Sequence, residues 1–361
     1  MDRPRTLVVG AGLAGLTAAR HLADEGHDVL IIEKSRSPGG RISTRRNDGG
    51  EFDHGAQYMT SRTPELNAVV NRLAQSGILA PWRPEGKDSS RPWWVGCPGM
   101  SALGKVLAEG LDIRLRNRAV TIARTDDGYR VEVETAEEET YSISARRIVV
   151  AIPATQAHAL LSPVDASFSQ ITDVEMAPCW CAMIAFNAKL DPVPDLIRGG
   201  PSDILSFVSR NSSKPGRTGE TFVLHASPEW SRTHLEDEKP SVTEAMLRAM
   251  QTMIGDAFKL PQPVHVSVHR WRYAQTATPL GMPFVANEDS SLLACGDWCI
   301  GARIEAQLQG TSTFSTFNTH LHVVGRTIMV VANLACGRGA AVRVRLILAL
   351  AGFVMLPAKQ L

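Results

Sequence analysis

Three glycines close to the N-terminus have the spacing of a backbone loop that binds a pyrophosphate. Gly10, Gly12 and Gly15 form the run G-x-G-x-x-G. The first glycine allows a tight turn, the second lets the backbone approach the phosphates, and the third lets a helix pack against a strand. In such sites an acid about 20 residues further on binds ribose hydroxyls, and Glu33 has that position. These four residues predict a dinucleotide-binding site.

The elements that would position this loop are present on both sides of it. Residues 6–9 are a short β-branched and apolar run, which predicts a buried strand. Residues 13–23 predict a helix, and Gly26 has the place of a glycine that ends one. Residues 28–33 predict a second buried strand that ends in the acid. A strand, a glycine turn and a helix in this order direct the N-terminal amides of the helix at the phosphates.

A second glycine-rich turn distinguishes between two classes of dinucleotide-binding protein. Gly39, Gly40 and Arg41 follow Glu33, and residues 50–58 read GEFDHGAQY. The glycine pair lets the backbone approach a ligand, and the arginine offers a fork of donors to a pyrophosphate. The arrangement resembles the amine-oxidase-like flavoprotein superfamily, in which the acid, the G-G-R turn and the D-x-G segment lie along one extended FAD. The resemblance implies FAD, because a nicotinamide dehydrogenase does not need the second turn.

The middle of the chain predicts the remainder of this domain. Residues 101–109 predict a helix. Apolar residues alternate from Ile113 to Val133, with a hairpin turn at Asp127-Gly128, which predicts a β-meander. Residues 147–153 predict another buried strand. A meander inserted before a returning parallel strand is what the resemblance implies for an FAD-binding fold.

Residues 156–289 predict a second domain with an antiparallel sheet. The run Ser241-Val-Thr-Glu244 predicts a capping box that opens a helix through Ile254. We therefore expect an α/β fold: a Rossmann-like two-dinucleotide-binding FAD domain with a second antiparallel-sheet α+β substrate domain. Strands of the second domain are expected at residues 180–186, 203–208, 221–226 and 264–271. The expected ranges are 1–60, 100–155 and 290–306 for the FAD domain, and 61–99 and 156–289 for the substrate domain.

A late Gly-Asp pair ends another short apolar strand. Residues 292–297 read LLACGD. Taken alone, Asp297 is most simply a helix N-cap. In the resemblance it accepts a hydrogen bond from the ribityl chain of FAD. A helix that begins near Arg303 would then direct its N-terminal amides at the flavin ring.

Further stretches narrow the resemblance to the bacterial renalase-like group, over residues 1–306. These stretches are WVGCPGMS (94–101), RNSSKP (210–215), LHA (224–226) with WSR (230–232), HRWRYA (269–274) and CGDWC (295–299) with Arg303 and Glu305. The resemblance implies an FAD-dependent oxidase that takes a hydride from the 2- and 6-dihydro isomers of NAD(P) and forms NAD(P)⁺, while dioxygen becomes hydrogen peroxide. The alternatives are a flavin amine oxidase and a flavin-binding protein inactivated by its altered C-terminus.

The resemblance also implies which residues bind the cofactor and the substrate. No catalytic residue is obligatory, because a dihydropyridine has only to be held against the flavin at about 3–3.5 Å. The expected FAD-binding residues are Gly10, Gly12, Leu13, Ala14, Gly15, Glu33, Lys34, Gly40, Arg41, Ala56, Gln57, Val120, Asp297 and Ile304. The expected substrate-binding residues are Tyr58, Thr60, Arg62, Trp94, Gly96, His225 and Trp298. No metal site is expected, because the cysteines lack zinc-ligand spacing.

Residues 307–361 depart from the family pattern. They contain five basic residues and no acidic one, within a total net charge of +1. The resemblance implies an amphipathic helix rich in Ala, Leu and Gly after Ala306, but residues 307–319 alternate between polar and apolar without a steady helical period. We hypothesise that this atypical basic tail comes from a reading frame shifted near codon 307. The alternative is a divergent tail that associates with membranes through residues 340–356.

Composition excludes several other classes of protein. The chain has 361 residues, 44% hydrophobic and 21% charged, which is globular usage and enough for about two domains. Its 38 basic and 37 acidic side chains show no excess for a nucleic-acid partner. The six cysteines lack disulfide spacing, and no apolar run is long enough for a signal peptide or a stable membrane span. We expect a cytoplasmic protein whose partners are a small-molecule dinucleotide and dioxygen.

Overall fold

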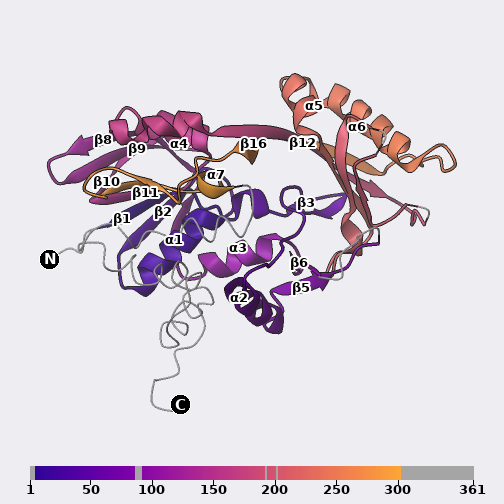
Figure 1. Cartoon of the computed structure of the whole chain (residues 1–361), viewed down its shortest axis with the longest axis horizontal. Helices are drawn as coiled ribbons and strands as arrows, with labels where there is room; N and C mark the ends of the chain where they lie inside the picture. The colour runs from indigo at the N-terminus through magenta and orange to yellow at the C-terminus, as the bar shows by residue number, and fades with distance from the viewer. Residues whose placement is uncertain (1–4, 86–91, 192, 201, 302–361) are drawn as a thin grey trace, which may run out of the picture.

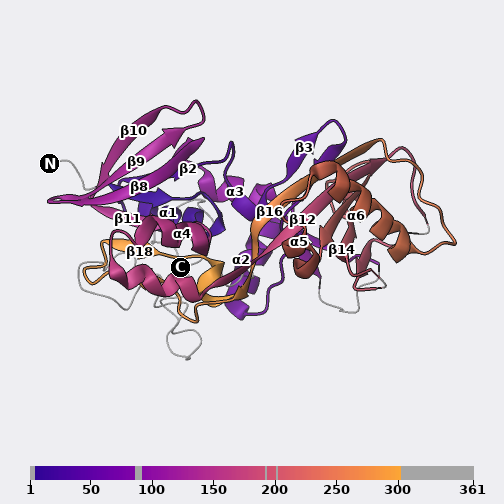
Figure 2. The ribbon, with the colours of Figure 1, turned by 90° about the horizontal axis from the view of Figure 1, so that it is seen from above.

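Two large sheets form the molecule, and two long strands of the second sheet extend to the first (Figure 1). The structure, a computed structural model, describes residues 5–85, 92–191, 193–200 and 202–301. The long strands are β12, Glu175–Phe186, and β16, His265–Thr278. Seen from above, the five-stranded sheet and a three-stranded meander lie at opposite ends of the molecule (Figure 2).

The first sheet has six strands in the order β17-β18-β11-β1-β2-β7. All neighbouring pairs are parallel except β17 with β18. The strands are β1 (Thr6–Val9), β2 (Val29–Glu33), β7 (Asp112–Leu115), β11 (Arg147–Val150), β17 (Val285–Ala286) and β18 (Leu292–Ala294). The central strands are buried along their whole length, because a parallel sheet is covered on both faces.

Helices cover one face of this sheet, and a meander with an α-helix and a 3-10 helix covers the other. Val8 and Ile31 point to the first face, where they pack with three helices: α1 (Leu13–Asp24), α2 (Pro64–Gln75) and α3 (Ser101–Ala108). Leu7 and Leu30 point to the opposite face. They pack there with β8 (Asn117–Thr125), β9 (Gly128–Thr135), β10 (Thr140–Ala145), α4 (Ala154–Leu161) and the 3-10 helix η2 (Ala166–Asp173). This alternation along each strand fixes the layers.

The second sheet is antiparallel, in the order β13-β14-β15-β12-β16. Its remaining strands are β13 (Leu196–Arg198), β14 (Leu205–Arg210) and β15 (Glu220–Ala226). The helices α5 (Pro228–Thr233) and α6 (Lys239–Ile254) cover one of its faces (Figure 1). Val242 and Met246 of α6 pack against Ile184 and Leu224 of the sheet.

Short elements connect the two sheets. Two hairpins pair β3 (Arg45–Asn47) with β4 (Gly50–Phe52) and β5 (Leu79–Trp82) with β6 (Trp93–Gly96). The short helices are η1 (Gly40–Ile42), η3 (Asn211–Ser213) and α7 (Asp297–Ile300). Among the described residues, no helix is long and apolar enough to cross a bilayer.

The expected fold class is confirmed: a Rossmann-like α/β unit is joined to an antiparallel-sheet α+β unit. One local prediction was wrong. The helix α6 begins at Lys239, so Ser241 lies inside it and makes no capping box. Pro240 in the first turn explains the earlier start, because proline needs no intrahelical acceptor there.

The domain boundaries stay a prediction. In the structure the apolar side chains of α2 pack in the same cluster as α1, and those of α4 pack beneath the parallel sheet. Arg303, Ile304 and the basic tail lie outside the described residues.

Candidate cofactor-binding site

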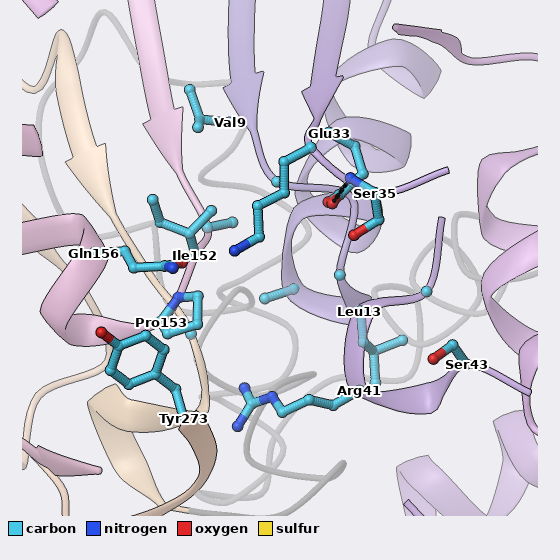
Figure 3. Close-up of a pocket in the computed structure, with 18 of the residues that line it drawn as sticks. Val9, Leu13, Glu33, Ser35, Arg41, Ser43, Ile152, Pro153, Gln156 and Tyr273 are labelled. Carbon is cyan, nitrogen blue, oxygen red and sulfur yellow. Dashed lines mark hydrogen bonds between the residues drawn. The ribbon is translucent and has the colours of Figure 1, made fainter. Parts of the chain in front are cut away.

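A cavity of about 900 Å³ opens at the carboxyl ends of β1, β2 and β11 and extends to β16. This is the edge at which open parallel sheets bind ligands, and the volume is in the range of about 300–1,000 Å³ typical of small-molecule sites. Glu33 lies at one end of the close-up view, and Arg41 and Tyr273 face each other across the other end (Figure 3). The lining therefore includes the acid of the first motif as well as the arginine of the second.

The glycine loop adopts the geometry that its spacing predicted. Gly10 has φ +103°, and a Cβ there would lie 2.7 Å from the carbonyl oxygen of Ala151. A Cβ at Gly15 would lie 1.9 Å from the carbonyl oxygen of Gly10, so only glycine lets α1 approach β1 this closely. A Cβ at Gly12 would meet no atom within 4 Å, and Gly12 lines the cavity. The backbone at Gly12 is therefore open to a ligand.

The N-terminus of α1 faces the cavity and suits an anion. The first helical hydrogen bond runs from the amide of Leu16 to the carbonyl of Gly12. The amides of Leu13 and Ala14 therefore have no acceptor within the helix, and both residues line the cavity. The first turn contains no acidic side chain that would compete with a phosphate. The loop and the helix together fit a pyrophosphate.

Glu33 is buried at the end of β2, where its carboxylate is held by two backbone amides. Ala11 donates to Oε2 at 2.7 Å, and Ser35 donates to Oε1 at 2.8 Å. Each carboxylate oxygen has a second lone pair, so the side chain can accept ribose hydroxyls as well. The two amides fix its orientation toward the cavity, as Figure 3 shows for Glu33 and Ser35.

Arg41 and Asp297 form a bidentate ion pair at the other end. The two guanidinium nitrogens donate to Oδ2 at 2.8 Å and to Oδ1 at 2.5 Å, and Arg41 also donates to the carbonyl of Ala274. Asp297 is 2% exposed and Arg41 is 25% exposed. Both residues line the cavity. The ion pair holds the arginine fork in place with a carboxylate that lies 256 positions away in the sequence.

Most of the expected FAD-binding residues line this one cavity. Gly15 lies behind the loop, where it packs on Gly10. Ala56 and Gln57 are absent from the lining: Ala56 donates to the Arg41 carbonyl, and the Gln57 side chain donates to the Gly55 carbonyl. The lining includes Gly10, Gly12, Leu13, Ala14, Glu33, Lys34, Gly40, Arg41, Val120 and Asp297. The loop, the helix N-terminus and the acid therefore all belong to one cavity, as a dinucleotide-binding site requires.

Of the expected substrate-binding residues, Trp298 alone is part of that lining. Its ring is fully buried, and its Nε1 donates to the carbonyl of Ile152. The ring of Tyr58 stacks on Trp93 at 3.6 Å between centroids, and Arg198 donates to its hydroxyl.

The other expected substrate-binding residues lie away from this cavity. Trp94 pairs through its backbone with Met59, the carbonyl of Gly96 accepts from Arg217, and His225 stacks near Phe207. Thr60 and Arg62 lie in the loop before α2. The roles of all seven stay a prediction.

Two histidines and a tryptophan beside the Asp297 end had no assigned role in the sequence analysis. His54, His269 and Trp271 line the cavity, and their rings lie 4.5–5.1 Å apart. Burial, followed by His269 and Arg45, lowers the pKa of His54 to about 3. Burial and then Arg45 lower the pKa of His269 to about 4. Both imidazoles are therefore neutral at pH 7. In the sequence, these three residues lie in the stretches GEFDHGAQY and HRWRYA, which were singled out for the resemblance.

A buried charge cluster ties the D-x-G segment to the second sheet. Asp53 accepts from Lys214 and Arg217, and Lys214 also donates to Gln57 and Asn211. Burial alone would raise the pKa of Asp53, but the charges of Lys214 and Arg217 lower it. Burial lowers the pKa of Lys214 to about 8. The side chains of Asp53 and Lys214 are fully buried, and neither lines the cavity. The cluster holds the loop in place rather than facing a ligand.

Two family models match the chain. The NAD(P)-binding Rossmann-like domain matches residues 8–73, and the flavin containing amine oxidoreductase matches residues 85–292. The second match covers more than half of the chain. The first contains the glycine loop and Glu33, and the second contains the helix α3, the meander and all five strands of the second sheet.

Individual relatives agree with these matches. The chain is 25% identical to renalase of Mus musculus over 301 residues, which are 76% of this chain and 86% of that protein. It is 54% identical to an L-amino acid oxidase of Cerastes cerastes over 66 residues, 18% of this chain and 12% of that protein. A solved candidate protoporphyrinogen oxidase of Exiguobacterium sp. 255-15 has a TM-score of 0.68 at 13% identity, covering 92% of this chain and 99% of that one, which shows the fold alone.

The cavity and the matches lead to the same family. The glycine loop, the α1 N-terminus and Glu33 fit a dinucleotide, and the second model names a flavin. The cofactor of the chain is FAD. The chain belongs to the flavin containing amine oxidoreductase family, as a renalase-like flavoprotein.

Proposed function

We propose that this flavin-dependent oxidoreductase oxidises the 2- and 6-dihydro isomers of NAD(P) to NAD(P)⁺. When bound, FAD would supply the hydride acceptor, and the two electrons with one proton from solvent would reduce dioxygen to hydrogen peroxide. The renalase of Mus musculus is similar over most of both chains and supports an oxidoreductase of this kind. The substrate is the part of the proposal that needs its own argument.

The observation that carries the proposal is the absence of a basic imidazole among the described residues that line the cavity beside β16. With pKa values of about 3 and 4, His54 and His269 are weak bases that hold no proton at pH 7. Asp297 is bound to Arg41 on both oxygens. A protonated amine must lose a proton before it can give up a hydride, and these groups are poorly suited to receive one. A dihydropyridine already carries a transferable hydride and needs no base.

Neutral imidazoles also suit the change of charge in this reaction. A dihydropyridine ring is uncharged, and it becomes a pyridinium cation when the hydride leaves. Two imidazolium groups beside the ring would oppose that charge, whereas two neutral imidazoles do not. His54, His269 and Trp271 then form a flat wall that orients a ring and excludes water.

The aromatic residues give less support to a flavin amine oxidase. An amine would need two separated aromatic faces, but Tyr58 and Trp93 stack on each other with their planes 5° apart. Trp298 is buried with its Nε1 bound to Ile152. Tyr58 and Trp93 therefore leave no gap between them for an amine.

Each end of the cavity has a proposed role toward the cofactor. The amides of Leu13 and Ala14, with the open backbone at Gly12, bind the pyrophosphate. Glu33 accepts the adenosine ribose hydroxyls, and Asp297 accepts a ribityl hydroxyl while it orients Arg41. A cytoplasmic location and dioxygen as the second substrate belong to the same proposal.

Product analysis in air tests the proposal. The FAD-loaded chain is incubated separately with borohydride-derived dihydro-NAD isomers and with primary and secondary amines. We expect NAD⁺ and hydrogen peroxide in equal amounts from the isomers and no peroxide from the amines. Peroxide from an amine, with no NAD⁺ from either isomer, would overturn the proposal in favour of amine oxidation.

A further inference from the structure

The cavity is lined by more cations than its carboxylates can neutralise. Four of the lining arginines form ion pairs. Arg41 pairs with Asp297, Arg118 pairs with Glu134, and Arg270 and Arg272 both pair with Glu236. Three other lining cations have no hydrogen-bond or ion-pair partner for their charged groups among the described residues: Lys34, Arg36 and Arg45. These three are the groups at which an anionic ligand could bind without displacing a protein carboxylate.

The three cations occupy two different parts of the cavity. Lys34 and Arg36 directly follow Glu33, at the end that fits an adenosine ribose. Arg45 lies on β3, and its charge acts on His54 and His269, next to β16. The pyrophosphate of FAD is accounted for by the glycine loop and the N-terminus of α1. Arg45 is therefore a cation beyond the part of the cavity that the phosphates of the cofactor need.

The position of Arg45 is fixed by the hairpin that carries it. Asn47 donates from its side chain to Ser267 of β16 at 3.4 Å, and the ring of Phe52 stacks with His265 at 6.2 Å. The backbone of Arg45 is paired with Phe52. Arg45 is half-buried, so an anion bound to it would be only partly screened by water. A half-buried cation on a fixed hairpin is a preformed anion site.

A second unpartnered group lies at the same end. Nδ1 of His54 is buried and has no hydrogen-bond partner among the described residues, although the side chain is 5% exposed and lines the cavity. Arg45 thus offers donors and a positive charge, and the ring of His54 forms part of the cavity wall at the same end. This combination suits a phosphate and the adjoining ribose of a nucleotide.

We propose that Arg45 binds the phosphate next to the nicotinamide riboside in the dinucleotide substrate, with the ring of His54 forming the wall beside its ribose. This inference rests on the proposed function and names the substrate group that the site recognises. It makes Arg45 a specificity residue that separates nucleotides from nucleosides.

Two oxidised ligands that differ by one phosphate test the inference without turnover. Nicotinamide riboside and nicotinamide mononucleotide are titrated into the FAD-loaded chain, and binding is followed by the change in the flavin absorbance. We expect the mononucleotide to bind about ten-fold more tightly or better, as a charge-assisted hydrogen bond implies. In Arg45→Gln the ratio should fall to about one, and Arg45→Lys should keep part of it.

Arg46 provides the matched control. It is the next residue of the same strand, but it is exposed and pairs with Glu51 outside the cavity. Arg46→Gln should leave the ratio of the two affinities unchanged. FAD content and thermal melting are measured on all variants, so that loss of the fold is not mistaken for loss of the phosphate contact.

The outcomes separate this inference from the proposed function. An unchanged ratio in Arg45→Gln, or equal binding of both ligands by the parent chain, would overturn the role of Arg45. Loss of FAD from both Arg45 variants, with Arg46→Gln fully loaded, would also overturn it and assign Arg45 to the cofactor. Reduction of the parent flavin by dihydro-NAD isomers, measured separately, decides the proposed function whatever the binding ratio is.

Discussion

Replacing Gly12 by alanine should separate cofactor binding from folding. A Cβ there meets no protein atom within 4 Å, and φ −71° with ψ 177° suits any residue. The substitution should therefore change the free energy of unfolding by no more than about 1 kcal/mol, and toward greater stability. The new methyl group would occupy the space through which the backbone reaches the pyrophosphate. Losing one charge-assisted hydrogen bond costs about 1.5–3 kcal/mol, which is roughly ten- to a hundred-fold in FAD affinity.

Gly15→Ala is the matched contrast, because its Cβ would lie 1.9 Å from the carbonyl oxygen of Gly10. Here the fold itself should lose about 1–3 kcal/mol or more, since α1 must move away from β1. Urea unfolding of the apoprotein measures stability, and quenching of flavin fluorescence on titration measures affinity. The reasoning fails if Gly12→Ala binds FAD as tightly as the parent chain, or if it destabilises the apoprotein as much as Gly15→Ala does.

Three further substitutions or conditions test other parts of the site. Glu33→Gln should weaken FAD binding about ten- to a hundred-fold in a fluorescence titration. It should also lower the melting temperature, because the amide oxygen accepts only one of the two backbone N–H groups that Glu33 binds; an unchanged affinity would remove Glu33 from its role. Asp297→Asn should lower the free energy of unfolding by up to about 3 kcal/mol and reduce bound flavin, because Arg41 loses its buried carboxylate; a fully loaded, equally stable variant would contradict this. Burial lowers the pKa of His54 to about 3 and those of His225 and His269 to about 4, so the unfolded chain binds more protons below pH 6.5. Their contribution to the free energy of unfolding is present above pH 6.5 and is lost as the pH falls toward 4, by up to about 1.4 kcal/mol per pH unit for each fully buried group. Urea unfolding between pH 7 and 4.5 measures how steeply the free energy of unfolding depends on pH. This dependence should be shallower in His54→Phe.

Local sequence signals predicted the Rossmann-like unit well. Three of its elements are adjacent in the chain: the strand at residues 6–9, the glycine turn and the helix that follows. The conformation of each can be predicted from its own residues alone. Glu33 was predicted at the cavity because it ends the next strand. The fold class followed from the same neighbouring elements.

Contacts between distant segments could not be predicted in this way. Arg41 and Asp297 were each assigned to FAD, but nothing in either motif indicates that they bind each other across 256 positions. Trp271 donates to the carbonyl of His54 from 217 positions away. The ring of Tyr58 stacks on Trp93 from the β5–β6 hairpin, a contact that neither motif indicates, and its role toward substrate stays a prediction. Such pairings depend on how β16 and the hairpins meet, which no local pattern records.

Anaerobic reduction of the bound flavin tests the central claim most directly. The FAD-loaded chain is mixed without oxygen with a single equivalent of a defined 2- or 6-dihydro isomer of NAD or NADP, and the flavin absorbance is followed in a stopped-flow instrument between pH 6 and 9. The account predicts rapid bleaching by at least one isomer, a rate that varies little across this range because no protonation state enters the step, and no bleaching by amines. Bleaching by an amine with a steep pH dependence, and none by any dihydro isomer, would contradict it.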